Sequence, residues 1–239
     1  MRRIHASVVR KAYPSPEDTN FGMAHAGLLF ELVVLFVGVP AAYRLSPVRI
    51  PALPVLWLAA GYAWWQLARD PGFDRHQLWN PAPLGSNLFG ILAIFFVVAA
   101  LQWAGVHWLA PNLEWSFARR HTRLWAMVML LYPVLSVYPQ AFLYRAFFMH
   151  RYAGLFPATP AGGLMLVFAS AAVFGGMHIV FRNNLAVALT FLGGLLFAWR
   201  YQHTGSLFVS SVEHALYGCW LFTVGLGQYF YHGVWPEPN

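Results

Sequence analysis

Long apolar runs alternate with short polar segments along the whole chain. A helix needs about 20 apolar residues to cross the hydrocarbon core of a bilayer. The pattern predicts seven spanning helices, and it gives eight if the fourth run breaks at Pro133 and Pro139, because proline interrupts a helix. The expected spans are residues 22–43, 51–68, 87–109, 124–142, 162–181, 184–202 and 205–230.

The composition favours the same membrane class. Hydrophobic residues make up 59% of the 239 residues and charged residues only 10%, whereas an ordinary soluble domain carries about 25% charged residues. Many aromatic residues stand beside the ends of apolar runs, as in a membrane-interface belt. A large soluble core would need far more charge to cover its surface. We therefore expect an all-α, polytopic membrane bundle that forms a single domain over residues 1–239.

The net charge of +7 comes almost entirely from arginine, since Lys11 is the only lysine. The arginines stand singly or in small groups between apolar runs, a pattern that fits contact with lipid headgroups and not a nucleic-acid surface. Membrane lipids are the expected partners, and no nucleic acid is expected. The single cysteine, Cys219, excludes an intrachain disulfide and a multi-cysteine metal site.

The first 20 residues are polar and basic, so no cleavable signal peptide is expected. The distribution of arginine and lysine favours a cytoplasmic N-terminus. The scarcity of lysine beside abundant arginine, tryptophan and alanine indicates a GC-rich bacterial genome, and hence the bacterial cytoplasmic membrane. The sequence gives no indication of the oligomeric state.

Arg145 lies in an apolar and aromatic run, YPQAFLYRAFF at residues 138–148, near the expected membrane edge. A guanidinium is always charged and needs a partner in an apolar setting. One helical turn earlier stands Ala141, where a carboxylate would be able to pair with Arg145. Gln140 is beside it. The chain therefore predicts a buried cation whose partner is missing.

Other ionisable residues also fall within the expected spans, at a cost of about 2.5–3.5 kcal/mol each on insertion scales. His178 follows two glycines that allow another helix or a substrate to approach closely. A histidine that only hydrogen-bonds a neighbouring helix is the alternative. Glu213 and His214 point about 100° apart on a helix, and Glu213 is at least as well explained by pairing with a basic group elsewhere. The same holds for Glu31.

Three motifs on successive spans resemble those of the CPBP family of intramembrane endopeptidases, which includes the CAAX-prenyl endopeptidases and the bacterial Abi proteins. The family motif EExxxR corresponds to QAFLYR at residues 140–145, and FxxxH corresponds to FGGMH at residues 174–178. The third motif, HxxxN, begins at His214 and has Gly218 in place of asparagine. The resemblance covers about residues 124–220.

The resemblance implies a helical bundle whose four-helix cavity opens within the bilayer. It implies a glutamate-dependent endopeptidase that forms no covalent intermediate, needs no cofactor and cleaves a membrane-bound or lipid-modified protein or peptide. His178 and a motif glutamate would activate a water molecule, because a carboxylate in a low-dielectric cavity can accept a proton near neutral pH. His214 would stabilise the oxyanion, and Arg145 would orient the glutamate or bind a substrate carboxylate.

The departures from the family motifs predict that the chain as written is inactive in proteolysis or nearly so. Neither Gln140 nor Ala141 is acidic, and Ala141 stands where we expect the general base. A form disabled by a glutamate-to-alanine change and a natural pseudoprotease both explain this. Gly218 leaves the second oxyanion donor unfilled, and a backbone group or Tyr217 is a candidate to replace it.

Three alternatives remain open from the residues alone. A metalloprotease would use His178, His214 and a carboxylate such as Glu213 to hold zinc, although the chain has no HExxH motif. A serine protease would use Ser210 with His214, four residues apart, although the serine lacks a Gly-x-Ser-Gly setting. A non-catalytic protein would bind a hydrophobic peptide or lipid between its helices. A transporter would show internal symmetry, and the sequence shows none.

Overall fold

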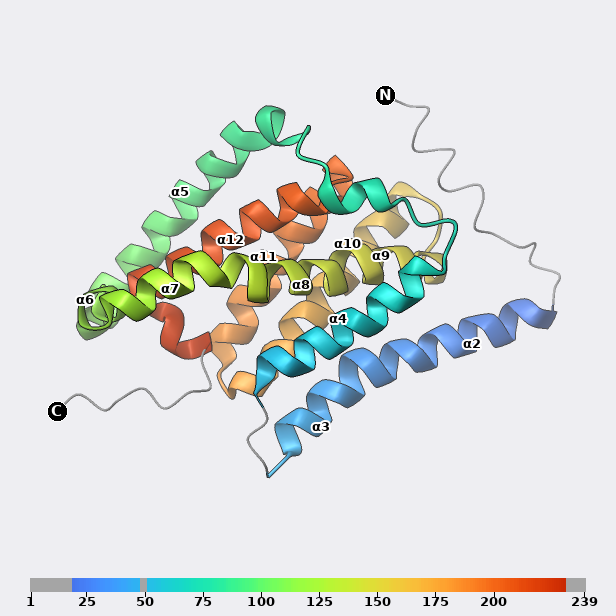
Figure 1. Ribbon diagram of the computed structural model, residues 1–239, viewed down its shortest axis with the longest axis horizontal. Coiled ribbons are helices and arrows are strands. Elements are labelled where there is room, and N and C mark those ends of the chain that lie inside the picture. Colours follow the sequence, from blue (N-terminus) through green and yellow to red (C-terminus); the bar gives the residue numbers. More distant parts are fainter. Residues whose placement is uncertain (1–18, 48–50, 231–239) are drawn as a thin grey trace.

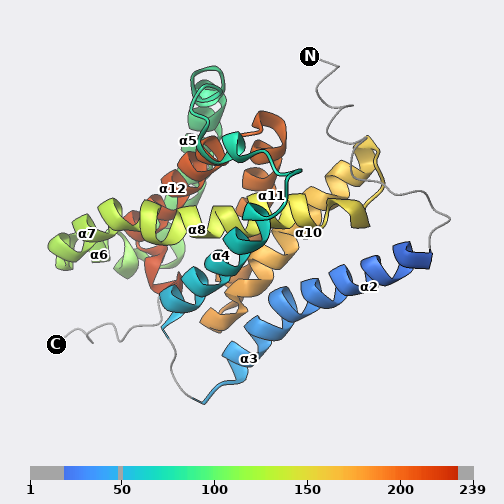
Figure 2. The same ribbon diagram turned by 45° about the vertical axis from the view of Figure 1, so that its right-hand side comes forward.

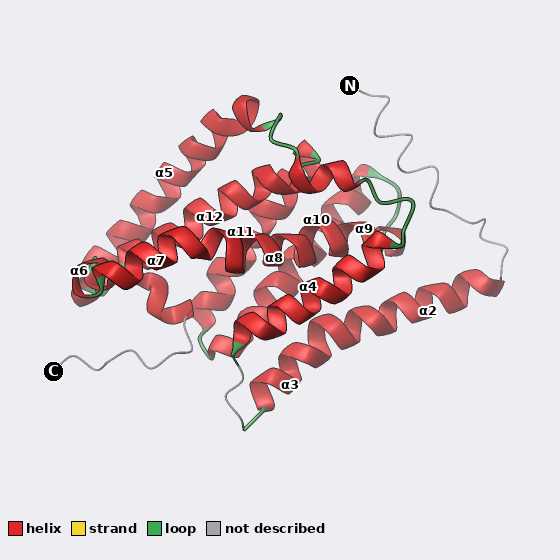
Figure 3. Ribbon diagram, in the orientation of Figure 1, coloured by secondary structure: helices red, strands yellow, loops and turns green. Residues whose placement is uncertain are grey.

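The computed structural model describes residues 19–47 and 51–230, and in these residues helices are joined by short loops and turns with no strand (Figure 1, Figure 3). The basic N-terminal residues that suggested the orientation lie outside this range. Six helices are long and apolar enough to cross a membrane. They are His25–Leu45, Leu84–Leu109, Thr122–Arg151, Pro160–Phe181, Asn184–Thr204 and Leu207–Val224. The expected all-α membrane bundle is thereby confirmed.

The second of the seven expected spans is also a helix, α4 (Ala52–Ala68), but its 17 residues make it shorter than the other six. The count of seven spans therefore stays a prediction.

The first half of the chain forms α2 (Thr19–Val33), η1 (Val34–Gly38), α3 (Val39–Leu45), α4, η2 (Arg75–Trp79), α5 (Leu84–Leu109), η3 (Pro111–Leu113) and α6 (Ser116–Arg120).

The second half of the chain contains one long composite helix followed by three further long helices. The composite helix is made of α7 (Thr122–Tyr132), η4 (Pro133–Val137), α8 (Tyr138–Ala141), η5 (Phe142–Phe147) and α9 (Phe148–Arg151). After it come η6 (Ala153–Leu155), α10 (Pro160–Met177), η7 (His178–Phe181), α11 (Asn184–Thr204), α12 (Leu207–Val224) and η8 (Leu226–Phe230).

The composite helix does not break at its prolines, so the division that would have given an eighth span does not occur. Pro133 opens the π-helical segment η4, and a second π-helical segment, η5, follows shortly after Pro139. A π-helical turn accommodates an extra residue locally while the chain stays helical. The helix runs on to Arg151 instead of ending near residue 142. Arg145 consequently lies inside the bundle and is only 1% exposed.

The helices cross in a bundle in which α2 and α3 run along one edge and α5 along the opposite edge (Figures 1 and 2). The most extensive helix contact joins α10 and α11. It is close because a Cβ atom on Gly175 would lie 2.9 Å from Cβ of Phe191, and one on Gly194 would lie 3.0 Å from Cα of Ala171. Small residues permit such contact between membrane helices. The expected close approach at Gly175 is confirmed, whereas Gly176 faces open space.

Large apolar side chains cover much of the outer surface of the described residues. Phe30, Leu58, Phe89, Leu109 and Leu130 are each more than 70% exposed. An exposed apolar belt of this kind is stable only against lipid. The outward-facing residues therefore agree with the composition in placing the bundle in a membrane.

Two ion pairs join different helices of the bundle. Glu31, on α2, accepts hydrogen bonds from Arg151 at 2.8 Å and from the Tyr152 hydroxyl at 3.1 Å. Glu213, on α12, accepts from Arg200 Nε at 2.8 Å and Nη2 at 3.1 Å. A structural role was expected for both glutamates, and both carboxylates do form ion pairs that join helices.

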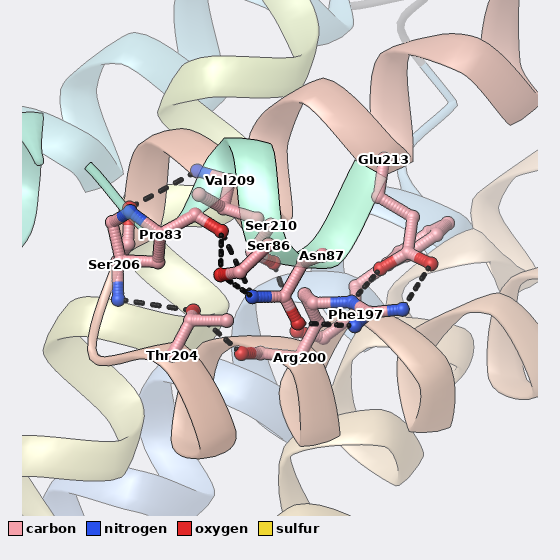
Figure 4. Close-up of polar contacts among 10 residues, drawn as sticks. All are labelled: Pro83, Ser86, Asn87, Phe197, Arg200, Thr204, Ser206, Val209, Ser210 and Glu213. Atoms are coloured by element: carbon pink, nitrogen blue, oxygen red, sulfur yellow. Dashed lines mark hydrogen bonds and ion pairs between the residues drawn. The ribbon is translucent and has the colours of Figure 1, made fainter. Parts of the chain in front are cut away.

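The pair of Arg200 and Glu213 is almost completely buried, with side-chain exposures of 4% and 0% (Figure 4). Arg200 Nη1 also donates to Oδ1 of Asn87 at 2.9 Å, which brings α5 into the same network. Nearby, the Ser210 hydroxyl donates to the Phe197 carbonyl at 2.8 Å, a second link between α11 and α12. These bonds fix how α11 and α12 are placed against each other.

We predict that Glu213→Ala lowers the free energy of unfolding by about 3–5 kcal/mol, because it leaves the Arg200 guanidinium buried without its counter-ion. Unfolding of the detergent-solubilised protein by a denaturing detergent measures the change. The paired variant Arg200→Met with Glu213→Leu should recover most of the loss, since neither charge then remains. A loss below 1 kcal/mol for Glu213→Ala would contradict the structural role of the pair.

Candidate functional site

A cavity of about 240 Å³ lies between α5, the composite helix, α10, α11 and α12. Most of its wall is apolar, which is typical of a site that accepts a hydrophobic ligand. The polar members of its lining are Gln102, Tyr132, Ser136, Gln140, His178, Thr190, His214 and Tyr217. The structure thus brings three of the five predicted site residues, Gln140, His178 and His214, to one cavity.

The composite helix presents a row of polar side chains to this cavity. Tyr132, Ser136 and Gln140 are spaced by four residues and therefore lie along one helix face. The Gln140 amide nitrogen donates to the Ser136 hydroxyl at 2.7 Å. This bond uses one of the two N–H donors of the Gln140 amide, so the other N–H and the carbonyl oxygen are the groups that a bound molecule would meet.

Ala141 does not line the cavity. It has no exposed surface and packs in the apolar core among the neighbouring helices. Consecutive helix residues point about 100° apart, so one of the two motif positions faces the cavity while the other faces protein. The sequence analysis assigned the general base to position 141, whereas the residue on the cavity wall is Gln140.

His178 lies at the end of α10, where the helix tightens into the 3₁₀ turn η7. Its Nδ1 is 2.7 Å from the Phe174 carbonyl oxygen, and its ring lies 4.9 Å from the Phe174 ring in an edge-to-face arrangement. A carbonyl accepts hydrogen bonds only, so Nδ1 carries the proton and Nε2 keeps its lone pair. The FxxxH spacing therefore fixes both the orientation and the tautomer of the imidazole.

His214 and His178 both contact the Phe174 ring. The His214 ring stacks on Phe197 at 4.6 Å and meets Phe174 at 5.4 Å. Its Nδ1 has no hydrogen-bond partner among the described residues. Glu213, the preceding residue, points to Arg200 instead, and the expected divergence of these two neighbours is confirmed.

Arg145 is buried behind the cavity wall and pairs with no carboxylate. All three of its guanidinium nitrogens lack a hydrogen-bond partner within residues 19–47 and 51–230. The guanidinium carbon instead lies 4.3 Å from the centre of the Phe174 ring and 5.3 Å from that of Phe197. Cation–π contact offsets part of the cost of desolvating the charge. The missing partner predicted from the sequence is thus replaced by two aromatic faces.

Of the described residues, no aspartate or glutamate lines the cavity. Glu213, the carboxylate that a zinc site would need, is held by Arg200. No group of three or more potential metal ligands is found in the described segments. Ser210, the nucleophile of the serine-protease alternative, donates its hydroxyl proton to the Phe197 carbonyl. These contacts favour neither the zinc metalloprotease nor the serine protease.

The sequence analysis overlooked Tyr132 and Ser136 as parts of the site. A signal was present, because both residues precede Gln140 at the four-residue spacing of a helix face. The two prolines in this stretch suggested a break, and a broken helix would not have carried the three side chains along one face.

The fold and the site together define a polytopic helical membrane protein with an internal cavity that presents one histidine from the end of α10 and one from α12. Residues 121–220 match the model of one family, described as type II CAAX prenyl endopeptidase Rce1-like. This region contains the three motifs that resemble those of the CPBP family. Comparisons with curated proteins and with solved structures gave no match.

We predict that Arg145→Met raises the free energy of unfolding by about 1–3 kcal/mol, because it removes a buried charge whose donors are unsatisfied. Thermal unfolding of the purified protein in detergent measures this change. Arg151→Met is the matched control, and it should destabilise the protein because it leaves Glu31 without its partner. Equal destabilisation by both substitutions would show that Arg145 is fully compensated.

Proposed function

We propose that this chain is an intramembrane endopeptidase scaffold of the CAAX-protease type that binds a membrane-bound or lipid-modified peptide but lacks the carboxylate needed to cleave it. The observation that carries the proposal is the composition of the cavity wall. Two oriented histidines and Gln140 face the cavity, and no carboxylate of the described residues does. The family match supports protease chemistry for this type of site.

The proposed chemistry of an active form begins with a glutamate at position 140. Its carboxylate takes a proton from a water molecule that also donates a hydrogen bond to Nε2 of His178. The hydroxide adds to the peptide carbonyl carbon, and the resulting oxyanion accepts a hydrogen bond from His214. The C–N bond then breaks, and the proton held by the glutamate passes to the leaving amine.

Gln140 can perform only part of this sequence. Its amide has the size of the glutamate side chain and can still accept a hydrogen bond through its carbonyl oxygen. It cannot accept a proton near neutral pH, so water would remain unactivated. The chain as written would therefore bind the peptide without turnover, which also describes the pseudoprotease alternative.

Position 141 has a different role in this proposal. A glutamate there would stand one turn before Arg145 on the same helix and would supply its missing counter-ion. It would act on the placement of the helix and not on the water. Arg145 would then orient the motif through this pair, close to the Phe174 ring that also contacts both histidines.

We propose the domain organisation, the membrane, the orientation and the route of the substrate on the same basis. The whole chain would act as one polytopic domain in the bacterial cytoplasmic membrane, with its N-terminus in the cytoplasm. Lipid surrounds the exposed apolar belt, and the substrate enters from the bilayer because most of the cavity lining is apolar.

We predict that Gln140→Glu combined with Ala141→Glu produces endopeptidase activity that the unmodified chain lacks. Membranes from cells expressing each form are compared by mass spectrometry of new peptide termini. Gln140→Glu alone should give weak activity and Ala141→Glu alone none, since only position 140 faces the cavity. Gln140→Met combined with Ala141→Glu is the matched control. A folded, abundant double variant that creates no new termini would refute the proposed function.

We further predict that His178→Ala in the active double variant abolishes the new termini and leaves the protein folded. Among the described residues the imidazole makes one hydrogen bond, to Phe174, and it lines a cavity that leaves room for the smaller side chain. Size-exclusion profiles and thermal unfolding establish that the fold is intact. Retained cleavage would remove His178 from the mechanism.

A further inference from the structure

A side chain from the composite helix fills the space that a side chain at position 218 would need. A Cβ atom built on Gly218 would lie 2.3 Å from Cε1 of Tyr132 and 2.5 Å from its hydroxyl oxygen. Real Cβ atoms do not approach other atoms so closely. Glycine at 218 and tyrosine at 132 are therefore sterically coupled, and the end of the phenol ring takes the place of the missing side chain.

The position of the Tyr132 hydroxyl is determined by its surroundings. Tyr132 is the last residue of α7, directly before the π-helical segment that Pro133 opens. Its ring meets the Phe222 ring at 5.4 Å in an edge-to-face contact. The residue lines the cavity together with Gly218 and His214, and the latter two share one face of α12. The hydroxyl thus lies beside Gly218, which is one helical turn from His214 on α12.

We propose that the Tyr132 hydroxyl donates a hydrogen bond to the carbonyl oxygen of the bound peptide, and so supplies the polar group that Gly218 lacks. A phenol keeps its proton at neutral pH and is therefore a permanent donor toward a developing oxyanion. His214 and Tyr132 would approach the same oxygen from two helices. This inference rests on the proposed function, because it assigns a group to the same reaction.

Tyr217 is the competing candidate and provides a matched control. Its hydroxyl has no hydrogen-bond partner among the described residues, and the residue also lines the cavity. Its ring, however, packs against Phe95 at 5.4 Å and Phe197 at 5.7 Å. Consecutive helix residues point about 100° apart, so Tyr217 is turned away from the face of Gly218, whereas the Tyr132 ring fills the space at its Cβ position.

The test uses the full-length variant that carries Gln140→Glu and Ala141→Glu, and measures the initial rate at which its new peptide termini appear. Tyr132→Phe removes only the hydroxyl and should slow cleavage roughly 100-fold or more, the range seen on loss of one oxyanion donor. Tyr217→Phe should slow cleavage at least tenfold less than Tyr132→Phe does. Equal effects of the two substitutions, or no effect of Tyr132→Phe, would overturn the assignment.

A rescue experiment separates hydrogen bonding from packing. Tyr132→Ala opens the space beside position 218 and removes the hydroxyl. Adding Gly218→Asn should then raise the cleavage rate at least tenfold above that of Tyr132→Ala alone. Gly218→Asn with Tyr132 retained should destabilise the protein in thermal unfolding, because the two side chains occupy one volume. Absence of this destabilisation would refute the steric coupling.

Failure of the inference and failure of the proposed function give different results. If the glutamate variant cleaves and Tyr132→Phe leaves its rate unchanged, only the role of Tyr132 is refuted. If the folded glutamate variant never cleaves, the proposed function is refuted, and the role of Tyr132 in that reaction is refuted as well.

Discussion

The ion pair of Arg200 and Glu213 sets the register of α11 against α12. The side chains that these two helices contribute to the cavity lining depend on this register. Phe197 stands one turn before Arg200, and His214 directly follows Glu213. A fixed ion pair therefore also fixes the stacking of His214 on Phe197. Burying two charges is favourable only when their geometry is good. The bidentate contact and the added bond from Arg200 to Asn87 supply that geometry.

Arg145 presents the opposite situation within the same bundle. It is buried as deeply as Arg200, yet only aromatic faces meet its guanidinium among the described residues. The contrast links an unsatisfied charge to a departure from the family motif at Ala141. Every guanidinium nitrogen of Arg200 has a hydrogen-bond partner, whereas none of those of Arg145 has one among the described residues.

Most of the fold was predictable because lipid imposes simple rules. Spans need long apolar runs and satisfied backbones, and both are visible in the sequence. The composite helix was the exception. Pro133 and Pro139 indicate a break when read locally, whereas the surrounding helices hold the segment in π-helical turns. That one difference moved Arg145 into the core and aligned Tyr132, Ser136 and Gln140 on the cavity wall.

The sequence by itself determined the membrane class, the motif order and the identity of the two histidines, because these depend on composition and on spacing along one helix. Only the tertiary structure decided which motif position faces the cavity, which residue pairs with Glu213 and what fills the space at Gly218. Each of these is a contact between segments distant in the chain. Such contacts follow from the crossing of helices, and no local pattern of residues encodes them.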